Sequence, residues 1–304
     1  MYPTQKKPAY GIFVQEQVQA LRKEGVEVDV LFVDGSKRKL NYIWGFFRFW
    51  GRLLSRRYDL IHAHYVFSGI IARAQFLYPV VLTHHGLETF MTWQRIPSRL
   101  IIPFMDRVIL VSEEQKKKLK CKKADVIPCG INFDLFKPVA RDKAREELNL
   151  PLDKKLVLWL GQHSRPEKRF DIIQAALDLA QKKDPTIDLV TVAGQPHEIV
   201  PGYMNACDVL PLVSDGEGSP MVIKEAMACN LPIVSVPVGD VPEVIKGTDG
   251  CYLCSREPAD VAEKLLIAMN HPGRTNGREK IKNMEQSIIA KRIMAVYKEV
   301  IREK

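Results

Sequence analysis

Residues 208–228 read Asp-Val-Leu-Pro-Leu-Val-Ser-Asp-Gly-Glu-Gly-Ser-Pro-Met-Val-Ile-Lys-Glu-Ala-Met-Ala, an apolar run followed by a glycine-containing turn and a helix-forming segment. The run over residues 208–214 has the length and composition of a buried β-strand. Ser219 is a favoured N-cap residue and Pro220 is favoured at the first helical position, so we predict a helix over residues 220–229. A strand, a turn and a helix in succession form the repeating unit of a parallel sheet.

The same alternation continues on both sides of this stretch. Strands are predicted over residues 26–33, 59–65, 79–85, 107–112, 124–129, 155–161, 188–194, 208–214, 232–238 and 250–254, and helices lie between most of them. Strands separated by helices imply parallel sheets with right-handed crossovers. Because 304 residues are more than one core usually supports, we expect an α/β protein with two doubly wound, Rossmann-like domains that face a cleft. The expected bounds are residues 1–140 for the N-terminal domain, 141–283 for the second domain and 284–304 for a final helix that packs back on the first.

The composition, 46% hydrophobic and 27% charged, is that of an ordinary globular chain and not of a disordered or collagen-like one. The chain holds no apolar run of about 18 residues, and residues 1–8 lack the apolar core of a signal peptide. We therefore expect neither a membrane-spanning helix nor secretion. Of the six cysteines, only Cys251 and Cys254 have C-x-x-C spacing, and no second pair or nearby histidine completes a zinc site. Reduced thiols in a cytoplasmic protein are the simpler interpretation.

The positive charge is concentrated in the first half of the chain. The net charge is +9, and Lys and Arg outnumber Asp and Glu over residues 1–140 but not over residues 141–304. The segment at residues 37–57 contains no acid; its basic residues are Lys37, Arg38, Lys39, Arg48, Arg52, Arg56 and Arg57, and its apolar residues at helical spacing include Ile43, Phe46, Phe47, Trp50, Leu53 and Leu54. This pattern is typical of a helix on an anionic membrane surface, and equally of a domain helix that packs its aromatic side chains inward. No nucleic-acid-binding motif accompanies the charge, so we expect no nucleic-acid partner.

The start of the helix predicted after residue 219 is a candidate anion site, because the free N–H groups of a first helical turn and the helix dipole attract negative charge. Glu217 lies just ahead of this helix, and Glu225 lies inside it, on the order of 8 Å further along. Two carboxylates at this spacing can hold sugar hydroxyls near Glu217 and ribose hydroxyls near Glu225. The plainer alternative is a loop charge and an exposed helix residue.

This stretch resembles the Glu-x7-Glu signature of retaining family 4 glycosyltransferases, which have the GT-B fold. Further segments resemble the family in the same order along nearly the whole chain. They are the glycine loop at residues 11–16, the catalytic-histidine strand at 59–65, the inter-domain stretch at 126–136 with Cys129 where Asn is usual, the phosphate-binding lysine motif at 165–171, and a loop at 238–243 that usually carries a glycine pair. Several matches in order are far more specific than any one of them.

The resemblance implies a role for each matching residue. Glu217 contacts the donor sugar, Glu225 holds the ribose, Lys168 neutralises the departing diphosphate, and His64 lies beside the donor sugar. Where the family has an arginine after the strand-end glycine, this chain has Gln162, and Arg165 is the candidate substitute. The predicted catalytic residues are therefore His64, Lys168 and Glu217, and the predicted donor-binding residues are Gly11, Gly161, Arg165, Lys168, Glu217, Gly218, Ser219, Pro220, Met221, Val222, Glu225 and Gly239.

Four histidines lie near the ends of adjacent predicted strands and could together bind a metal ion. They are His62, His64, His84 and His85. No carboxylate accompanies them, and the family is metal-independent, so we expect no metal. We expect His62 to be a core histidine with satisfied hydrogen bonds.

The resemblance also implies the reaction, the partners and the location. It implies transfer of a sugar from a UDP-, GDP- or ADP-sugar to a glycan or lipid-linked acceptor in polysaccharide biosynthesis, with retention of configuration and no further cofactor. The expected location is cytoplasmic, including peripheral attachment to the inner face of the cytoplasmic membrane through residues 37–57. Two alternatives stay open: a nucleotide-sugar 2-epimerase of the same fold, and an inactive donor-binding relative. Because family members begin with a strand before the loop that starts here at Met1, we expect the N-terminal domain to lack its first, central strand.

Overall fold

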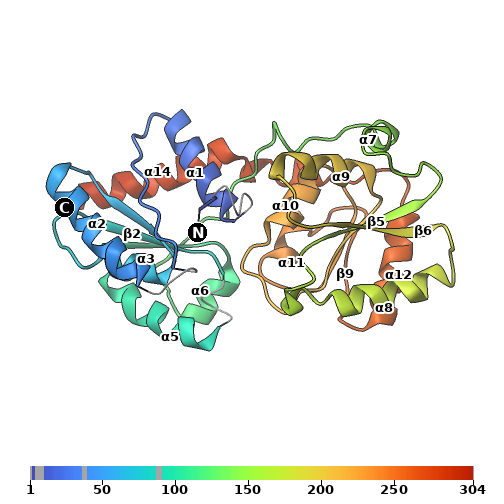
Figure 1. The fold of residues 1–304 in the computed structure, drawn as a ribbon, viewed down its shortest axis with the longest axis horizontal. Helices are drawn as coiled ribbons and strands as arrows, with labels where there is room; N and C mark the ends of the chain where they lie inside the picture. The colour runs from blue at the N-terminus through green and yellow to red at the C-terminus, as the bar shows by residue number, and fades with distance from the viewer. Residues whose placement is uncertain (1, 4–9, 36–39, 87–90, 304) are drawn as a thin grey trace. The chain divides into compact units, whose positions relative to one another are not determined.

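The computed structural model describes residues 2–3, 10–35, 40–86 and 91–303. The chain forms two compact units (Figure 1). Unit 1 is Met1–Gly130 together with Gln286–Lys304, and unit 2 is Ile131–Glu285. The boundaries thus lie after residues 130 and 285, whereas the sequence analysis placed them after residues 140 and 283.

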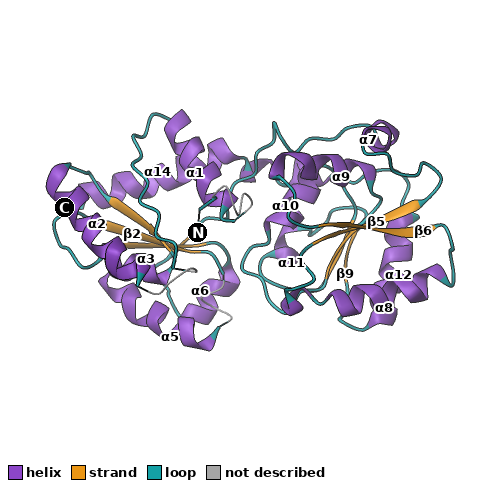
Figure 2. Cartoon of the chain, in the orientation of Figure 1, coloured by secondary structure: helices purple, strands orange, loops and turns teal. Residues whose placement is uncertain are grey.

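Unit 1 is built on a parallel sheet with helices on both faces (Figure 2). Its strands, in spatial order, are β1 (Ile61–His64), β2 (Val80–His84), β3 (Arg107–Leu110) and β4 (Asp125–Val126). Its helices are α1 (Ile12–Lys23), α2 (Asn41–Ser55), α3 (Val66–Ala72), α5 (Thr92–Ile101), the 3-10 turn η1 (Ile102–Phe104), α6 (Glu113–Leu119) and α14 (Gln286–Arg302). Every residue of β2 is buried, which explains why its sequence is a continuous apolar run and not an alternating one.

The two faces of this sheet are covered by different helices. Val81 and Ile109 pack in one cluster with residues of α1 and α14, and Val80 and Leu82 pack in another with Ala72 of α3. Neighbouring residues of one strand contribute to opposite clusters because side chains alternate along a strand. The final helix therefore belongs to unit 1, and Figure 1 shows α14 alongside α1.

The prediction of a strand over residues 26–33 is wrong: these residues pair with no strand in the described parts of the chain. Side-chain bonds hold the segment instead. Arg22 Nη2 donates to the carbonyl of Val28 at 2.7 Å, and Arg52 Nη1 and the Tyr58 hydroxyl each donate to the Asp29 carboxylate at 2.8 Å. An alternating sequence makes one side of a strand apolar, but a strand also needs a neighbouring backbone, and within the described residues β1 pairs with β2 alone.

Unit 2 is a second parallel sheet, ordered β6-β5-β7-β8-β9 when the bridge between Val157 and Val209 is included. Its strands are β5 (Lys155–Leu160), β6 (Ile187–Val192), β7 (Leu210–Leu212), β8 (Ile233–Ser235) and β9 (Cys251–Leu253). Its helices are α7 (Arg141–Glu147), η2 (Pro166–Lys168), α8 (Phe170–Gln181), η3 (His197–Ile199), α9 (Val200–Ala206), α10 (Met221–Ala228), α11 (Val241–Val244), α12 (Pro258–Met269), α13 (Gly277–Lys280) and η4 (Lys282–Met284). One large apolar cluster runs through the unit. The α/β prediction with parallel, doubly wound sheets is confirmed.

Candidate functional site

The strand order of unit 2 indicates where a ligand binds. The chain leaves β5 for β6 on one side and then crosses to β7 on the other, so the direction of winding reverses between β5 and β7. In open α/β sheets, ligands bind beyond the carboxyl ends of the strands at such a switch point. The segments that follow β5 and β7 hold most of the predicted donor-binding residues. Gly161 directly follows β5, and a Cβ there would lie 2.7 Å from the Trp159 ring.

Lys168 and Glu217 form a close ion pair at this switch point. Lys168 ends the turn η2 after β5, Glu217 follows β7, and Lys168 Nζ lies 2.5 Å from Glu217 Oε1. Their side chains are only 16% and 18% exposed, so water screens the pair weakly. A backbone bond from Asp215 N–H to the carbonyl of Glu167 joins the two loops. The arrangement places a cation and a hydrogen-bond acceptor side by side in a partly desolvated position.

The start of α10 lies next to this pair, but its cap differs from the predicted one. The helix begins at Met221, with Pro220 in the N-cap position and no side-chain cap. Ser219 is therefore not the N-cap. Its hydroxyl donates to Asp240 Oδ2 at 2.6 Å, because the loop after β8 runs against this turn. The first N–H groups of α10, those of Met221 and Val222, thus remain without a capping side chain.

Two further contacts lock this turn. Lys224 has a fully buried side chain, and its Nζ lies 2.9 Å from Asp240 Oδ2. Gly239 has a φ of 58°, and a Cβ on it would lie 2.6 Å from the carbonyl oxygen of Gly218. Only glycine allows both this backbone conformation and this approach. The turn after β7 and the loop after β8 therefore support each other.

Glu225 is a buried carboxylate, not the exposed helix residue of the plainer alternative. Its side chain is 9% exposed, and its Oε1 lies 2.9 Å from Nε2 of His197. His197 begins η3 after β6, and its ring packs 5.1 Å from the ring of Phe136. The sequence analysis missed His197. The available signal was its place after a predicted strand, because the carboxyl ends of parallel strands share one edge of the sheet.

Arg165 does not join the Lys168 and Glu217 pair in the described contacts. Its Nε donates to Glu167 Oε1 at 2.7 Å, and its side chain is 47% exposed. The neighbouring Arg169 is held by Asp171 and Asp215. Lys168 is thus the basic residue of this motif that the structure brings to Glu217.

The predicted residues of unit 1 lie at the carboxyl edge of its sheet. His64 ends β1, and its Nδ1 is 2.9 Å from Nε2 of His85, which follows β2. His62 is satisfied on both ring nitrogens, by the Tyr297 hydroxyl at 2.6 Å and by Thr83 Oγ1 at 2.7 Å. Burial lowers the pKa of His62 to about 4. Burial, and then the neighbouring histidines, lower the pKa of His64 and of His85 well below 6.5.

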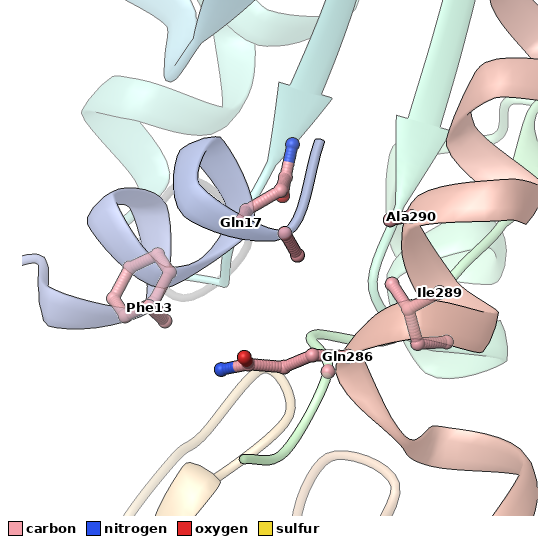
Figure 3. A pocket seen from close by; sticks show the side chains of 7 residues that line it. Phe13, Gln17, Gln286, Ile289 and Ala290 are labelled. Carbon is pink, nitrogen blue, oxygen red and sulfur yellow. The ribbon is translucent and has the colours of Figure 1, made fainter. Parts of the chain in front are cut away.

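Unit 1 also contains the predicted residue Gly11 and a small cavity. Gly11, with a φ of 75°, caps the start of α1, and the ring of Phe13 in the first turn lies 4.8 Å from that of His85. A small cavity beside α1 and α14 is lined by residues that include Phe13, Gln17 and Gln286 (Figure 3). Its walls carry no ionisable side chain. Among the described residues, no group of three or more His, Cys, Asp or Glu side chains is arranged to hold a metal ion.

Comparison with known proteins assigns this chain to a class of enzymes. Residues 11–135 match the family model Glycosyltransferase Family 4, and residues 171–271 match the model Glycosyl transferases group 1. The chain is 26% identical to a Bacillus subtilis protein named for teichuronic acid biosynthesis glycosyltransferase activity, over 79% of this chain and 80% of that protein. It is 26% identical to D-inositol 3-phosphate glycosyltransferase of Mycolicibacterium smegmatis, over 68% of this chain and 59% of that protein, so it spans less than two thirds of the latter.

Solved structures show the same fold. Sucrose-phosphate synthase from Thermosynechococcus elongatus superposes with a TM-score of 0.77 at 20% identity, covering 97% of this chain and 94% of that one. Anabaena HepE in complex with UDP-glucose superposes with a TM-score of 0.68 at 17% identity, covering 93% and 88%. The family matches extend over both units, and the parallel sheets agree with the GT-B architecture. The chain is thus a member of the GT-B glycosyltransferases, with a family 4 region in its first half and a group 1 region in its second.

Proposed function

We propose that the protein transfers a sugar from a nucleoside-diphosphate sugar to a hydroxyl group of a glycan or lipid-linked saccharide, with retention of configuration. The observation that carries the proposal is the pairing of Lys168 with Glu217 at the switch point of unit 2, next to the start of α10. HepE, one of the proteins of similar fold, was crystallised with UDP-glucose. We assign a UDP-, GDP- or ADP-sugar as the donor here.

Each part of such a donor has a matching group. The diphosphate is a dianion, and the Lys168 ammonium together with the N–H groups of Met221 and Val222 supplies donors for it. The ribose hydroxyls suit the Glu225 carboxylate, which His197 orients. The sugar hydroxyls suit Glu217. In the absence of donor this carboxylate accepts a hydrogen bond from Lys168, and we propose that this bond breaks when the Lys168 ammonium binds the phosphate instead. We include Gly11 and Gly239 as close-approach positions, and His64 as a contact to the sugar.

The proposed chemistry follows from charge. The bond between the anomeric carbon and the diphosphate oxygen breaks, the acceptor oxygen attacks the same face, and the acceptor proton passes to the departing diphosphate. Negative charge grows on the diphosphate as that bond breaks, and a fixed cation such as Lys168 lowers the barrier. This mechanism needs no metal, so we propose a metal-independent enzyme.

The test is a calorimetric binding screen of UDP-, GDP- and ADP-sugars, followed by a transfer assay. Lys168→Met and Glu217→Gln each remove one partner of the pair. Lys282→Met is the matched control, because Lys282 pairs with Glu279 on the surface of the same unit at 69% and 74% exposure. A charged hydrogen bond lost from a desolvated site weakens binding roughly 10-fold to 100-fold. If Lys168→Met binds the donor as tightly as the wild type does, the site assignment is wrong. If the donor sugar is isomerised in the absence of any acceptor, the protein is an epimerase instead.

We propose in addition that unit 1 attaches to the inner face of the cytoplasmic membrane. Helix α2 buries Phe49 and Leu53 but leaves a second apolar row outside, with Trp44 70%, Phe47 61% and Leu54 82% exposed. The inward-packing alternative is therefore true of one side of the helix only. Lys37, Arg38 and Lys39 lie outside the described residues, and Arg48 lies on the exposed face of the helix. In the described part of the chain, no helix has the length and apolarity to cross a bilayer.

A second helix of unit 1 carries another exposed apolar row. On α5, Trp93, Ile96 and Leu100 form an exposed row at 61%, 56% and 66%. Helix α3 lies between the two helices, because the ring of Phe67 packs 5.4 Å from Tyr42 of α2 and 5.9 Å from Trp93 of α5. Exposed apolar side chains on neighbouring helices, with the exposed Arg48 on α2, suit an anionic bilayer.

Sedimentation with lipid vesicles tests this attachment. We expect the wild type to pellet with vesicles that contain phosphatidylglycerol and to be released by salt, because the arginines bind the charged surface. Trp44→Glu combined with Trp93→Glu is expected to stay in the supernatant. The control Leu152→Glu alters an apolar side chain of unit 2 that is 53% exposed, and it is expected to pellet normally. Equal sedimentation of all three proteins rules the membrane face out.

A further inference from the structure

Lys224 is a fully buried cation whose side chain returns to the start of α10. It is the fourth residue of this helix, and its side chain is 0% exposed. Its Nζ lies 2.9 Å from Asp240 Oδ2 and also donates to the Ser219 hydroxyl. The Ser219 hydroxyl in turn donates to the same Asp240 oxygen at 2.6 Å. The three side chains thus form a closed hydrogen-bonded set, called the buried triangle below.

Each member of the buried triangle comes from a different segment of unit 2. Ser219 lies in the turn after β7, Lys224 lies in α10, and Asp240 lies in the loop after β8, where it is the N-cap residue of α11. The turn and the loop also meet through their backbones, because a Cβ on Gly239 would lie 3.0 Å from the carbonyl oxygen of Glu217. The turn that carries Glu217 is therefore held at two neighbouring points.

Fold stability alone gives little reason for a buried ion pair at this place. Taking two charges out of water is costly, and replacing such a pair by apolar side chains often leaves a protein equally stable or more stable. The helix adds to the cost, because its N-terminus carries a positive partial charge that disfavours a nearby ammonium. The Asp240 carboxylate offsets this repulsion. What the pair provides, through short directional bonds, is a single geometry for three segments.

We propose that Lys224 and Asp240 are positioning residues that act through the Ser219 hydroxyl. Their role is to fix Glu217 relative to the first N–H groups of α10. This role rests on the proposed function, in which Glu217 holds the sugar and these N–H groups hold the diphosphate. The bond that breaks joins those two parts of the donor. A shift of the turn against the helix therefore misplaces the reacting bond, and a displacement of about 1 Å can lower a rate about 100-fold.

Hydrogen exchange on the full chain without ligand tests the geometry. Ser219→Ala removes the hydroxyl that ties the turn to the buried triangle and leaves Lys224 paired with Asp240. The N–H of Ile223 donates to the carbonyl of Pro220 at 3.3 Å and so reports on the first turn of α10. We expect this N–H to exchange about 10-fold faster in Ser219→Ala, because the lost hydroxyl bonds to two charged groups. Unchanged exchange at Ile223 in the variant overturns the proposal.

Unit 2 contains a second set of the same chemistry, which supplies the matched control. Thr186 Oγ1 donates to Asp184 Oδ1 at 2.5 Å, and Lys155 Nζ lies 2.9 Å from Asp184 Oδ2. Lys155 begins β5 and Thr186 precedes β6, so this set lies at the amino ends of the strands, on the edge opposite the switch point. Thr186→Ala is expected to leave both the exchange of Ile223 and the transfer rate as in the wild type. Equal effects of the two alanine variants indicate general destabilisation and contradict the proposal.

Kinetics separate positioning from a direct contact between Ser219 and the donor. Ser219→Ala is expected to lower kcat about 10-fold, as the loss of a charged hydrogen bond implies, while KM changes less because Glu225 and His197 still hold the ribose. The same change is made in Lys224→Met combined with Asp240→Asn, where both charges are removed together. There it is expected to cost less than in the wild type, because residues that act as one unit are not additive. Equal losses in both backgrounds assign a direct donor contact to Ser219 and overturn the proposal.

The positioning role and the proposed function fail separately. If the wild type turns over no nucleoside-diphosphate sugar but Ile223 exchanges faster in Ser219→Ala, the proposed function fails and the structural coupling stands. If the wild type transfers sugar and folded Ser219→Ala is equally active, the positioning role fails and the proposed function stands.

Discussion

The acid stability of unit 1 depends on a histidine that has to stay neutral. His62 connects three elements, because its ring lies between the Tyr297 hydroxyl of α14 at 2.6 Å and Thr83 Oγ1 of β2 at 2.7 Å. Burial lowers its pKa from 6.5 to about 4. Lowering the pH from 7 to 5 therefore protonates this side chain in the unfolded chain and leaves it neutral in the folded one.

The size of the effect follows from linkage. Between the two pKa values the unfolded state binds one more proton, so the free energy of unfolding falls as the pH falls. Neutral His62 contributes this stability fully above pH 6.5 and loses it toward pH 4. The slope is about 1.4 kcal/mol per pH unit, which amounts to about 2 kcal/mol between pH 7 and pH 5.

Urea unfolding of the wild type and of His62→Gln at both pH values measures this loss. Glutamine can still donate to one neighbour and accept from the other, but it does not titrate. Of the four tryptophans, only Trp159 lies in unit 2, so fluorescence in a Trp159→Phe background reports unit 1. The free energy of unfolding is expected to fall by about 2 kcal/mol more in the wild type than in the variant. His64 and His85 are present in both proteins, so their contributions cancel except for the part of their lowered pKa that is due to His62 itself. An equal loss in both refutes the assignment of a neutral, buried His62.

Three more outcomes follow from the site. Transfer is expected to persist in EDTA, and activity that returns only on addition of a divalent cation contradicts the metal-independent mechanism. Gly239→Ala is expected to abolish most donor binding in calorimetry, because its Cβ would lie 2.6 Å from the Gly218 carbonyl; Gly247→Ala, at a similar φ of 66° with nothing within 4 Å, is expected to keep donor binding and to lose only about 1–2 kcal/mol of stability. Lys224→Met leaves the Asp240 carboxylate without its buried cation and is expected to destabilise unit 2 by about 3–5 kcal/mol in urea unfolding, with partial recovery in Lys224→Met combined with Asp240→Asn.

The elements could largely be predicted because their causes are local. The apolar run and the helix-starting residues after it lie within one short stretch of sequence. The structure has a strand at residues 210–212 and a helix that follows it, as predicted. The segment at residues 26–33 has an equally good alternating pattern and formed no strand. Alternation describes the faces of a strand, whereas its existence depends on a backbone partner that is far away in the sequence.

In the candidate site, too, the features with local causes could be predicted and those that depend on distant residues could not. The spacing of Glu217 and Glu225 is a short-range pattern, and the resemblance to a known signature identified both. The partners that define their environment are distant: Lys168 is 49 residues from Glu217, and His197 is 28 residues from Glu225. No motif marks His197, and its place after a predicted strand becomes informative only when the parallel order of β5, β6 and β7 puts its loop beside the other two.

The helical pattern of α2 was predicted correctly, but the sequence did not show which of its apolar residues are buried. Apolar residues occur around most of this helix, so periodicity alone could not separate an inward face from a membrane-binding one. The structure assigns Phe49 and Leu53 to the core and leaves Trp44 and Phe47 exposed. Folding accounts for the first pair because they remove apolar surface from water. Burial gives no such benefit to the second pair, so their exposure leaves an external apolar partner as the hypothesis to be tested.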